Sequence, residues 1–147
     1  MLERAQAALE ASIRAARDVE LALRPPLIEE AGLGPPLRWL VSRVAADGPI
    51  EVNLPLTVPR LDSEAEGLLF GAVDLLLSRG FRGARRLDVE ATDASLALRI
   101  EGKPTRDFAF ALAAARERLQ GRARVAATTR PRPAVLVRVS RSGRRRA

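Results

Sequence analysis

The spacing of apolar residues changes along this chain, and that change constrains the fold more than any other feature. Over residues 2–24 the apolar positions alternate steps of three and four, which places them on one stripe of an α-helix. The stripe consists of Leu2, Ala5, Leu9, Ile13, Ala16, Val19 and Leu23, with Ser12 among them. One helix cannot bury such a stripe against itself. The helix must therefore either dock on the rest of the chain or pair with a second copy.

Prolines and glycines divide the remaining residues into segments of different period. Pro25 and Pro26 end the first helix, and Pro35-Pro36 begins a second helix that closes at Asp47-Gly48. Helical spacing returns twice, which predicts helices over residues 63–79 and 105–119. A period of two predicts five strands, over residues 50–54, 87–91, 96–100, 123–127 and 135–139.

Local signals place several boundaries of these elements. Ser63 and Glu66 have the spacing of a capping box, and Gly80 is expected to end the helix that they open. Thr105 is expected to cap the next helix. The segment Gly102-Lys103-Pro104 is expected to interrupt the third strand, because proline removes a backbone donor.

The order of the elements predicts the fold class. Short loops between successive strands favour antiparallel hairpins, so the helices should lie together on one face of a mixed, mostly antiparallel sheet. This is a two-layer α/β (α+β) sandwich preceded by a long N-terminal helix. We expect a helical arm over residues 1–48, the sandwich over 49–140 and a basic tail over 141–147.

The composition excludes several kinds of chemistry. The chain has no histidine and no cysteine, so neither a disulfide nor a Cys/His zinc site can form, and no metal site is expected. No apolar stretch approaches the roughly 20 residues that span a bilayer. A soluble cytoplasmic protein is the resulting expectation, with no membrane partner.

The net charge of +7 is concentrated at one end of the chain. Residues 121–147 contain nine of the 25 basic residues and none of the 18 acidic ones, which leaves residues 1–120 with a net charge of −2. The extreme is a tail that carries Arg141, Arg144, Arg145 and Arg146. Such a tail can meet nucleic acid phosphates or an acidic partner, or it can simply aid solubility.

Two stretches, together with the order of elements, resemble the GHKL (Bergerat) ATPase domain of sensor histidine kinases. They are Leu-Arg-Pro-Pro-Leu-Ile-Glu-Glu-Ala-Gly-Leu at 23–33 and Arg-Glu-Arg-Leu-Gln-Gly-Arg at 116–122 before a hairpin. The first is similar to the end of the second dimerisation helix in kinases of the nitrate- and degradation-sensor type. The likeness spans roughly residues 15–140.

This resemblance implies where nucleotide-binding residues would stand. The family's Glu and Asn, four residues apart on a long helix, would correspond to Asp74 and Ser78, or to Leu75 and Arg79 after a slip of one residue. The family's Asp-x-Gly-x-Gly motif would correspond to the stretch that begins Glu101-Gly102.

The departures from the family pattern point to lost catalysis. Asp74 and Ser78 are weaker magnesium ligands, and the glycine-rich lid is replaced by residues 107–112, which contain no glycine. Phosphotransfer through a histidine of this chain is excluded by composition.

Three functional hypotheses follow. The first is a non-catalytic, histidine-kinase-like regulatory module of two-component signalling, without a cofactor, that binds itself, a kinase or a response regulator. The second is an ATP- and Mg²⁺-binding sensor with unusual ligands. The third is nucleic-acid binding through the Arg tail. Side chains that fill the space between helix 64–79 and segment 101–108 would favour the first, whereas an open polar cleft would favour the second.

Overall fold

The computed structural model describes residues 4–9 and 32–140. Within the predicted N-terminal stripe, Ala5 and Leu9 fall inside these ranges, and residues 4–9 are helical and exposed. The other stripe positions and the predicted Arg tail at 141–147 lie outside the described residues.

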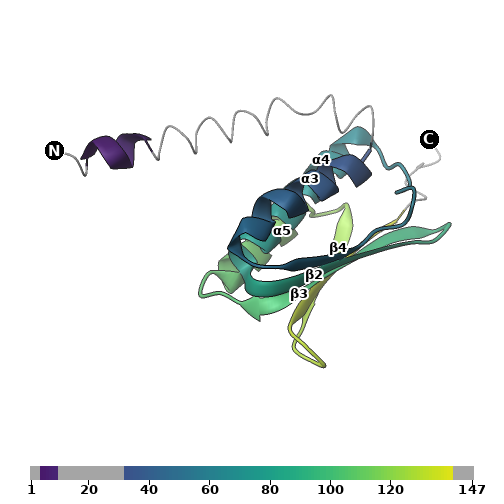
Figure 1. The fold of residues 1–147 in the computed structure, drawn as a ribbon. Coiled ribbons are helices and arrows are strands. Elements are labelled where there is room, and N and C mark those ends of the chain that lie inside the picture. Colours follow the sequence, from purple (N-terminus) through teal and green to yellow (C-terminus); the bar gives the residue numbers. More distant parts are fainter. Residues whose placement is uncertain (1–3, 10–31, 141–147) are drawn as a thin grey trace.

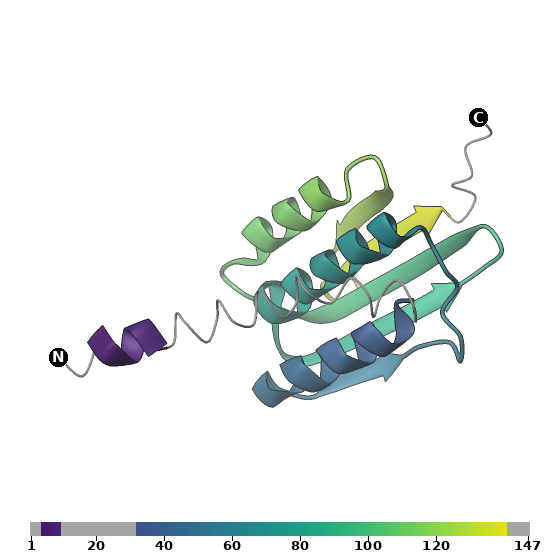
Figure 2. The same cartoon turned by 90° about the horizontal axis from the view of Figure 1, so that it is seen from above.

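Over residues 32–140, the helices lie together on one face of a single sheet (Figures 1 and 2). The helices are α3 (Gly34–Val44), α4 (Ser63–Leu75) and α5 (Phe108–Arg118), with a 3₁₀ turn η1 (Ala45–Asp47) after α3 and a π turn η2 (Leu76–Gly80) after α4. The strands are β1 (Ile50–Asn53), β2 (Phe81–Ala91), β3 (Ser95–Pro104), β4 (Ala123–Thr128) and β5 (Ala134–Ser140). The predicted two-layer sandwich is confirmed.

The sheet has the order β1-β2-β3-β5-β4. β1 runs parallel to β2, because helix α4 connects them, and the other neighbouring strands are antiparallel. The sheet is therefore mixed and mostly antiparallel, as the loop lengths predicted. β1 and β4 form its two edges.

The core lies between the helices and the sheet. It is built mainly from Leu and Val on alternate strand positions, which face the helices because side chains in a strand alternate between its two faces. Leu87 and Val89 of β2 and Leu98 and Ile100 of β3 are examples, each at most 5% exposed. The intervening strand positions form the sheet's outer face, which no helix of residues 32–140 covers (Figure 1).

Two strands, β2 and β3, are much longer than the sequence pattern predicted. β2 begins at Phe81 rather than near residue 87, and a bulge between Arg82 and Arg86 hides its period of two. β3 is not interrupted at Gly102-Lys103-Pro104, so that expectation was wrong: Pro104 is the last residue of the strand and lies opposite Phe81. A strand end tolerates proline because no further ladder bond is needed there.

Both predicted caps also differ from the structure. Asp62, rather than Ser63, is the N-cap of α4, and its carboxylate accepts from the Ala65 amide at 2.8 Å. Glu66 cannot complete a capping box, because its buried carboxylate is bound by Arg60. Thr105 lies in the turn before α5, where its hydroxyl accepts from the Asp107 amide instead of capping the helix.

Candidate functional site

The two helix positions implied for magnesium lie together, as their spacing predicted. Asp74 of α4 and Ser78 of η2 are joined by a hydrogen bond of 2.9 Å, in which the Ser78 hydroxyl donates to Asp74 Oδ1. The same carboxylate oxygen accepts from Arg43 Nη2 of α3 at 2.5 Å. Arg43 also lies over the Trp39 ring, 5.1 Å from its centroid. The negative charge of Asp74 is therefore compensated by a guanidinium of this chain.

The two strand positions implied for the adenine lie elsewhere. Glu101 is on β3 next to Ile100, which is fully buried against the helices, so the Glu101 side chain lies on the outer face of the sheet. There it accepts from Arg99 Nε at 2.6 Å. The sheet thus separates Glu101 from the Asp74/Ser78 pair, and the residues that the resemblance grouped do not line one pocket.

Gly102 is a packing residue of the sheet. A Cβ atom at this position would lie 2.8 Å from the Phe81 Cβ and 3.0 Å from the Arg85 Cγ. Its amide donates to the Pro133 carbonyl at 3.3 Å. The absence of a side chain at Gly102 is therefore explained by the close approach of β2, which does not require a nucleotide.

The space between α4 and segment 101–108 contains side chains. Phe81 and Phe108 lie with ring centroids 5.2 Å apart. Around Gly80, an added Cβ would meet Leu76, Ala111 and Phe108 within 3.7 Å. The connection from β3 to α5 consists of residues 105–107 alone. It is tied to the end of η2, because the Thr105 amide donates to the Gly80 carbonyl at 3.0 Å and its hydroxyl donates to the Arg79 carbonyl.

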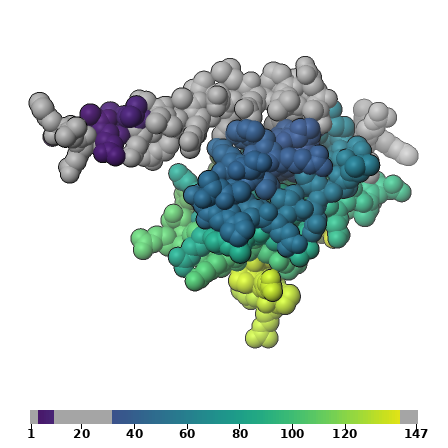
Figure 3. All heavy atoms as spheres, viewed as in Figure 1, coloured from purple at the N-terminus to yellow at the C-terminus, as the bar shows by residue number. Residues whose placement is uncertain are grey.

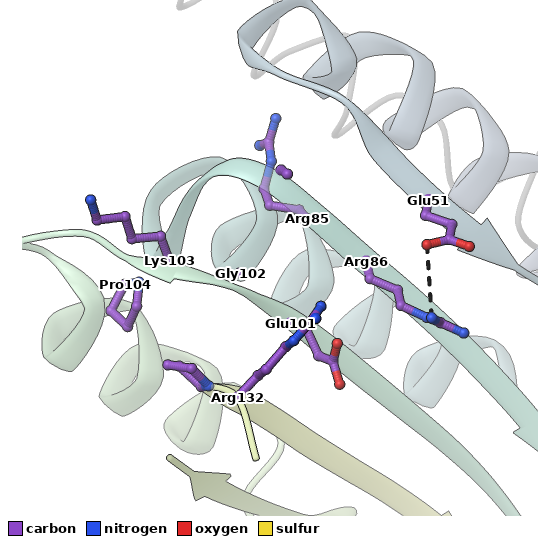
Figure 4. A pocket seen from close by; sticks show the side chains of 10 residues that line it. Glu51, Arg85, Arg86, Glu101, Gly102, Lys103, Pro104 and Arg132 are labelled. Atoms are coloured by element: carbon purple, nitrogen blue, oxygen red, sulfur yellow. Dashed lines mark ion pairs between the residues drawn. The ribbon is translucent and has the colours of Figure 1, made fainter. Parts of the chain in front are cut away.

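A hollow of about 390 Å³ lies on the outer face of the sheet (Figure 4). Its lining includes Glu51, Arg86, Glu101, Lys103 and Arg132. Acidic and basic side chains pair on this face. Arg86 of β2 pairs with Asp88 of the same strand at 2.8 Å and with Glu51 of β1 at 3.7 Å. The hydrogen bond that Arg86 donates to the Asp88 carboxylate, together with the nearby charge of Asp88 and Glu51, raises the pKa of Arg86. This hollow is therefore lined by both signs of charge, most of which are already paired.

Sequence reasoning missed the most buried cation among the described residues. Arg85 is 4% exposed, and its guanidinium lies beneath the helix layer, where it donates to four carbonyl oxygens. These are Leu77 at 2.7 Å, Val44 at 2.9 Å, Gly83 at 3.1 Å and Gly48 at 3.2 Å. Burial lowers the pKa of Arg85. Its position in the strand could have identified it as buried, because residues 85, 87 and 89 share the inward face of a strand.

Arg85 joins the ends of two helices. The carbonyls of Val44 and Gly48 belong to the C-terminal end of α3 with η1, and that of Leu77 belongs to the end of α4 with η2. Such carbonyls lack partners within their own helix and carry the negative end of its dipole. The arrangement ties the ends of these two helices to β2 and so stabilises the fold.

The described residues also place limits on metals and membranes. Within residues 4–9 and 32–140, no group of three or more His, Cys, Asp or Glu side chains is arranged to hold a metal ion. No helix in those same ranges is both long and apolar enough to cross a bilayer.

The fold of this chain is a two-layer sandwich of the kind found in histidine kinases. One similar structure is the Erythrobacter litoralis EL346 blue-light activated histidine kinase, with a TM-score of 0.57 and 19% identity over 76% of this chain and 46% of that one. Another is the Acinetobacter baumannii histidine kinase AdeS, with a TM-score of 0.58 and 15% identity over 92% of this chain and 83% of that one. This chain thus spans about half the length of the first structure. No protein-family model and no curated protein sequence matches it.

Proposed function

We propose that this chain is a non-catalytic, histidine-kinase-like module that acts by protein–protein contact in two-component signalling. In this proposal it is a degenerate GHKL domain, and its segment 23–33 derives from the dimerisation helix of a kinase of the nitrate- and degradation-sensor type. The histidine-kinase-like fold supports the signalling context. The absence of histidine from the chain excludes it as a histidine phosphoacceptor.

The observation that carries the proposal is the three-residue connection between β3 and α5. A lid over a triphosphate needs a glycine-rich segment whose amides can turn toward phosphate oxygens. Here residues 105–107 contain no glycine, and Thr105 is bonded to the end of η2 through both its amide and its hydroxyl. With Phe81 and Phe108 packed beside this connection, the space expected for a nucleotide holds protein side chains.

The charge of Asp74 gives independent support. A carboxylate that binds Mg²⁺ must offer its oxygens to the metal. Asp74 Oδ1 instead accepts from both Arg43 and Ser78. A metal at this oxygen would have to displace the guanidinium, which is unfavourable because two cations would then compete for one carboxylate.

The alternative, an ATP- and Mg²⁺-binding sensor, makes the opposite prediction in a thermal melt. A ligand at 100 times its dissociation constant stabilises the folded state by about 2.7 kcal/mol. We expect no change in melting temperature at millimolar ATP with Mg²⁺, either for the natural chain or for Asp74→Asn. A stabilisation that appears in the natural chain and is lost in Asp74→Asn would refute the non-catalytic assignment and support the sensor.

Self-association through the N-terminal helix is the contact that the sequence pattern supports best. Leu9, a stripe position, is 61% exposed in the structure. An apolar side chain left in water gains free energy when a partner covers it. The stripe therefore suits pairing with a second copy, although a kinase or a response regulator could present an equivalent surface.

The test is the molar mass in solution, measured by light scattering. We expect a dimer for the full chain and a monomer once residues 1–31 are removed. Leu9→Asp should also give a monomer, whereas Ala7→Asp, an exposed position on the opposite helix face, should not. A full chain that is already monomeric, or two variants that behave alike, would exclude dimerisation through the stripe.

A further inference from the structure

The edge of the sheet at β1 combines a free strand side with a neighbouring helix. Among the strands of residues 32–140, β1 pairs only with β2, so its other side has no strand beside it. Helix α3 lies over β1 along this edge, and both elements reach the surface of the molecule (Figures 2 and 3). An exposed edge strand presents backbone groups with which another chain can pair.

The backbone groups on the free side of β1 belong to Ile50 and Val52. The Pro49 carbonyl accepts from the Arg85 amide at 3.0 Å, which directs residue 49 toward β2. Backbone groups point to alternate sides along a strand, so Ile50 and Val52 direct their amides and carbonyls away from β2. Each of these residues therefore offers one donor and one acceptor to an added strand. Pro49 and Pro55 flank β1 and keep this edge short.

A hollow of about 350 Å³ lies between α3 and β1. Its lining consists of Arg38, Val41 and Ser42 from α3, Val52 from β1 and Leu54 just after the strand. The three apolar side chains are partly buried, whereas those of Arg38 and Ser42 are exposed. Every second residue of an added strand would face the helix side, so the hollow offers apolar contact to alternate side chains of such a strand.

Arg38 is the charged group of this hollow. Helix α3 contains two arginines, Arg38 and Arg43, and no acidic residue. Arg43 is bonded to Asp74, whereas the Arg38 side chain forms no hydrogen bond or ion pair with any residue in the described ranges. The lining contains no acidic residue either. An exposed arginine beside an apolar hollow therefore favours a ligand that carries a carboxylate.

We propose that the edge formed by α3 and β1 binds an extended segment of a partner protein, which adds a strand beside β1 and places an acidic side chain on Arg38. Backbone hydrogen bonds to Ile50 and Val52 hold the segment, and the hollow selects its alternate side chains. A second copy of β1 fits less well, because the helix-side residues of β1 are apolar and bring no carboxylate to Arg38. This surface is distinct from the N-terminal helix, so it is tested separately from self-association.

Peptide selection on the full chain tests this proposal. The probe is a phage-displayed library of random peptides of about ten residues, the upper length of a typical strand. The library is selected on the immobilised natural chain after counter-selection on Arg38→Glu. We expect enriched sequences that alternate β-branched residues and carry an Asp or Glu. A fluorescein-labelled copy of the most enriched peptide is then titrated with the chain, and its binding is followed by fluorescence anisotropy.

Two single variants test the charge. Arg38→Gln should weaken the binding of this peptide about fivefold, because it removes one half of the ion pair. The matched control is Arg116→Gln, which removes the same charge from an exposed position of α5, at the other side of the helix layer (Figure 2). It should bind within about twofold of the natural chain, since salt screens a distant exposed charge. Both variants should keep the melting temperature of the natural chain, so that a loss of binding is not a loss of folding.

Methylated peptides test the backbone pairing. The amides of an added strand point alternately toward β1 and away from it. Two peptides are made, each N-methylated at one of two consecutive central amides. The peptide whose methylated amide faces β1 should lose about tenfold in affinity, and the other should stay within about twofold. A segment bound as a helix or only through its side chains would not distinguish the two.

Three kinds of result would overturn the proposal. The first is a selection that enriches no peptide, or only peptides without an acidic residue. The second is equal binding by the two methylated peptides, or equal weakening by Arg38→Gln and Arg116→Gln. The third is a molar mass in solution that halves in Val52→Lys but not in Leu9→Asp, which would assign this edge to a second copy of the chain.

Discussion

Replacing Arg85 by methionine should destabilise the sandwich far more than any exposed arginine can. Methionine keeps much of the buried volume and removes every donor, so the four carbonyls that Arg85 binds, those of Val44, Leu77, Gly48 and Gly83, lose their partner. A buried polar group without a hydrogen bond costs about 1–3 kcal/mol, and the favourable interaction of a cation with a helix C-terminus adds about 0.3–1 kcal/mol.

The net change in the free energy of unfolding has three terms: the carbonyls left without a partner, the lost interaction with the helix ends, and the charge that is no longer buried. Two of the four lost bonds, to Val44 and Leu77, are buried, and water can reach the Gly48 and Gly83 carbonyls in part. Against this loss, Met avoids the desolvation of a charge, which is the cause of the lowered pKa of Arg85. We therefore expect a loss of about 2–4 kcal/mol, a large share of the 5–15 kcal/mol typical of a domain.

Urea denaturation measures this change. Arg82→Met is the matched control, because Arg82 is an exposed neighbour on the same strand, and it should change stability by less than about 0.5 kcal/mol. Arg85→Lys keeps the charge but offers a compact ammonium in place of the guanidinium fork, so its stability should lie between those of the natural chain and Arg85→Met. Equal midpoints for Arg85→Met and Arg82→Met would refute the role of this cation.

Two further pairs of substitutions test the packing and the cap. Gly102→Ala should cost about 1–3 kcal/mol in urea denaturation, because its Cβ would lie 2.8 Å from that of Phe81. Gly67→Ala, on an exposed helix position with open space, should instead stabilise by about 0.5–1 kcal/mol. If both variants changed the free energy of unfolding in the same direction, the close approach at Gly102 would be contradicted. Asp62→Ala should lower the melting temperature through a cap loss of about 0.5–2 kcal/mol, whereas Ser63→Ala should leave it nearly unchanged; the reverse order would restore Ser63 as the cap.

The elements with a clean apolar period were predictable from the sequence. The strand at residues 96–100 alternates Leu or Ile with Ala or Arg, the strand at 135–139 has Val at every second position, and the helix after Ser63 has helical spacing throughout. The bulge in β2 was not predictable, since Gly83 and Ala84 break the alternation that identifies a strand. β3 passes through Gly102 because a neighbouring strand needs the space, and that requirement is not local.

The residues that the resemblance implied for nucleotide binding were likewise predictable only where a local pattern decides their position. Helical spacing alone placed Asp74 and Ser78 side by side. Their ionic partner, Arg43, comes from a different helix 31 residues away, and no local pattern identifies it. The position of Glu101 on the opposite side of the sheet follows from strand parity, once the strand is known to continue past residue 100.

By itself, the sequence determined which chemistry is impossible and which segments repeat with which period. A chain without histidine or cysteine lacks their reactions in any fold, and periodicity is a local property of the backbone. Only the tertiary structure decided that Arg85 meets two helix ends and that Arg124 lies opposite Arg138. Both depend on which strands pair and in what register, and register is set by the burial of a whole face of the sheet rather than by neighbours in the chain.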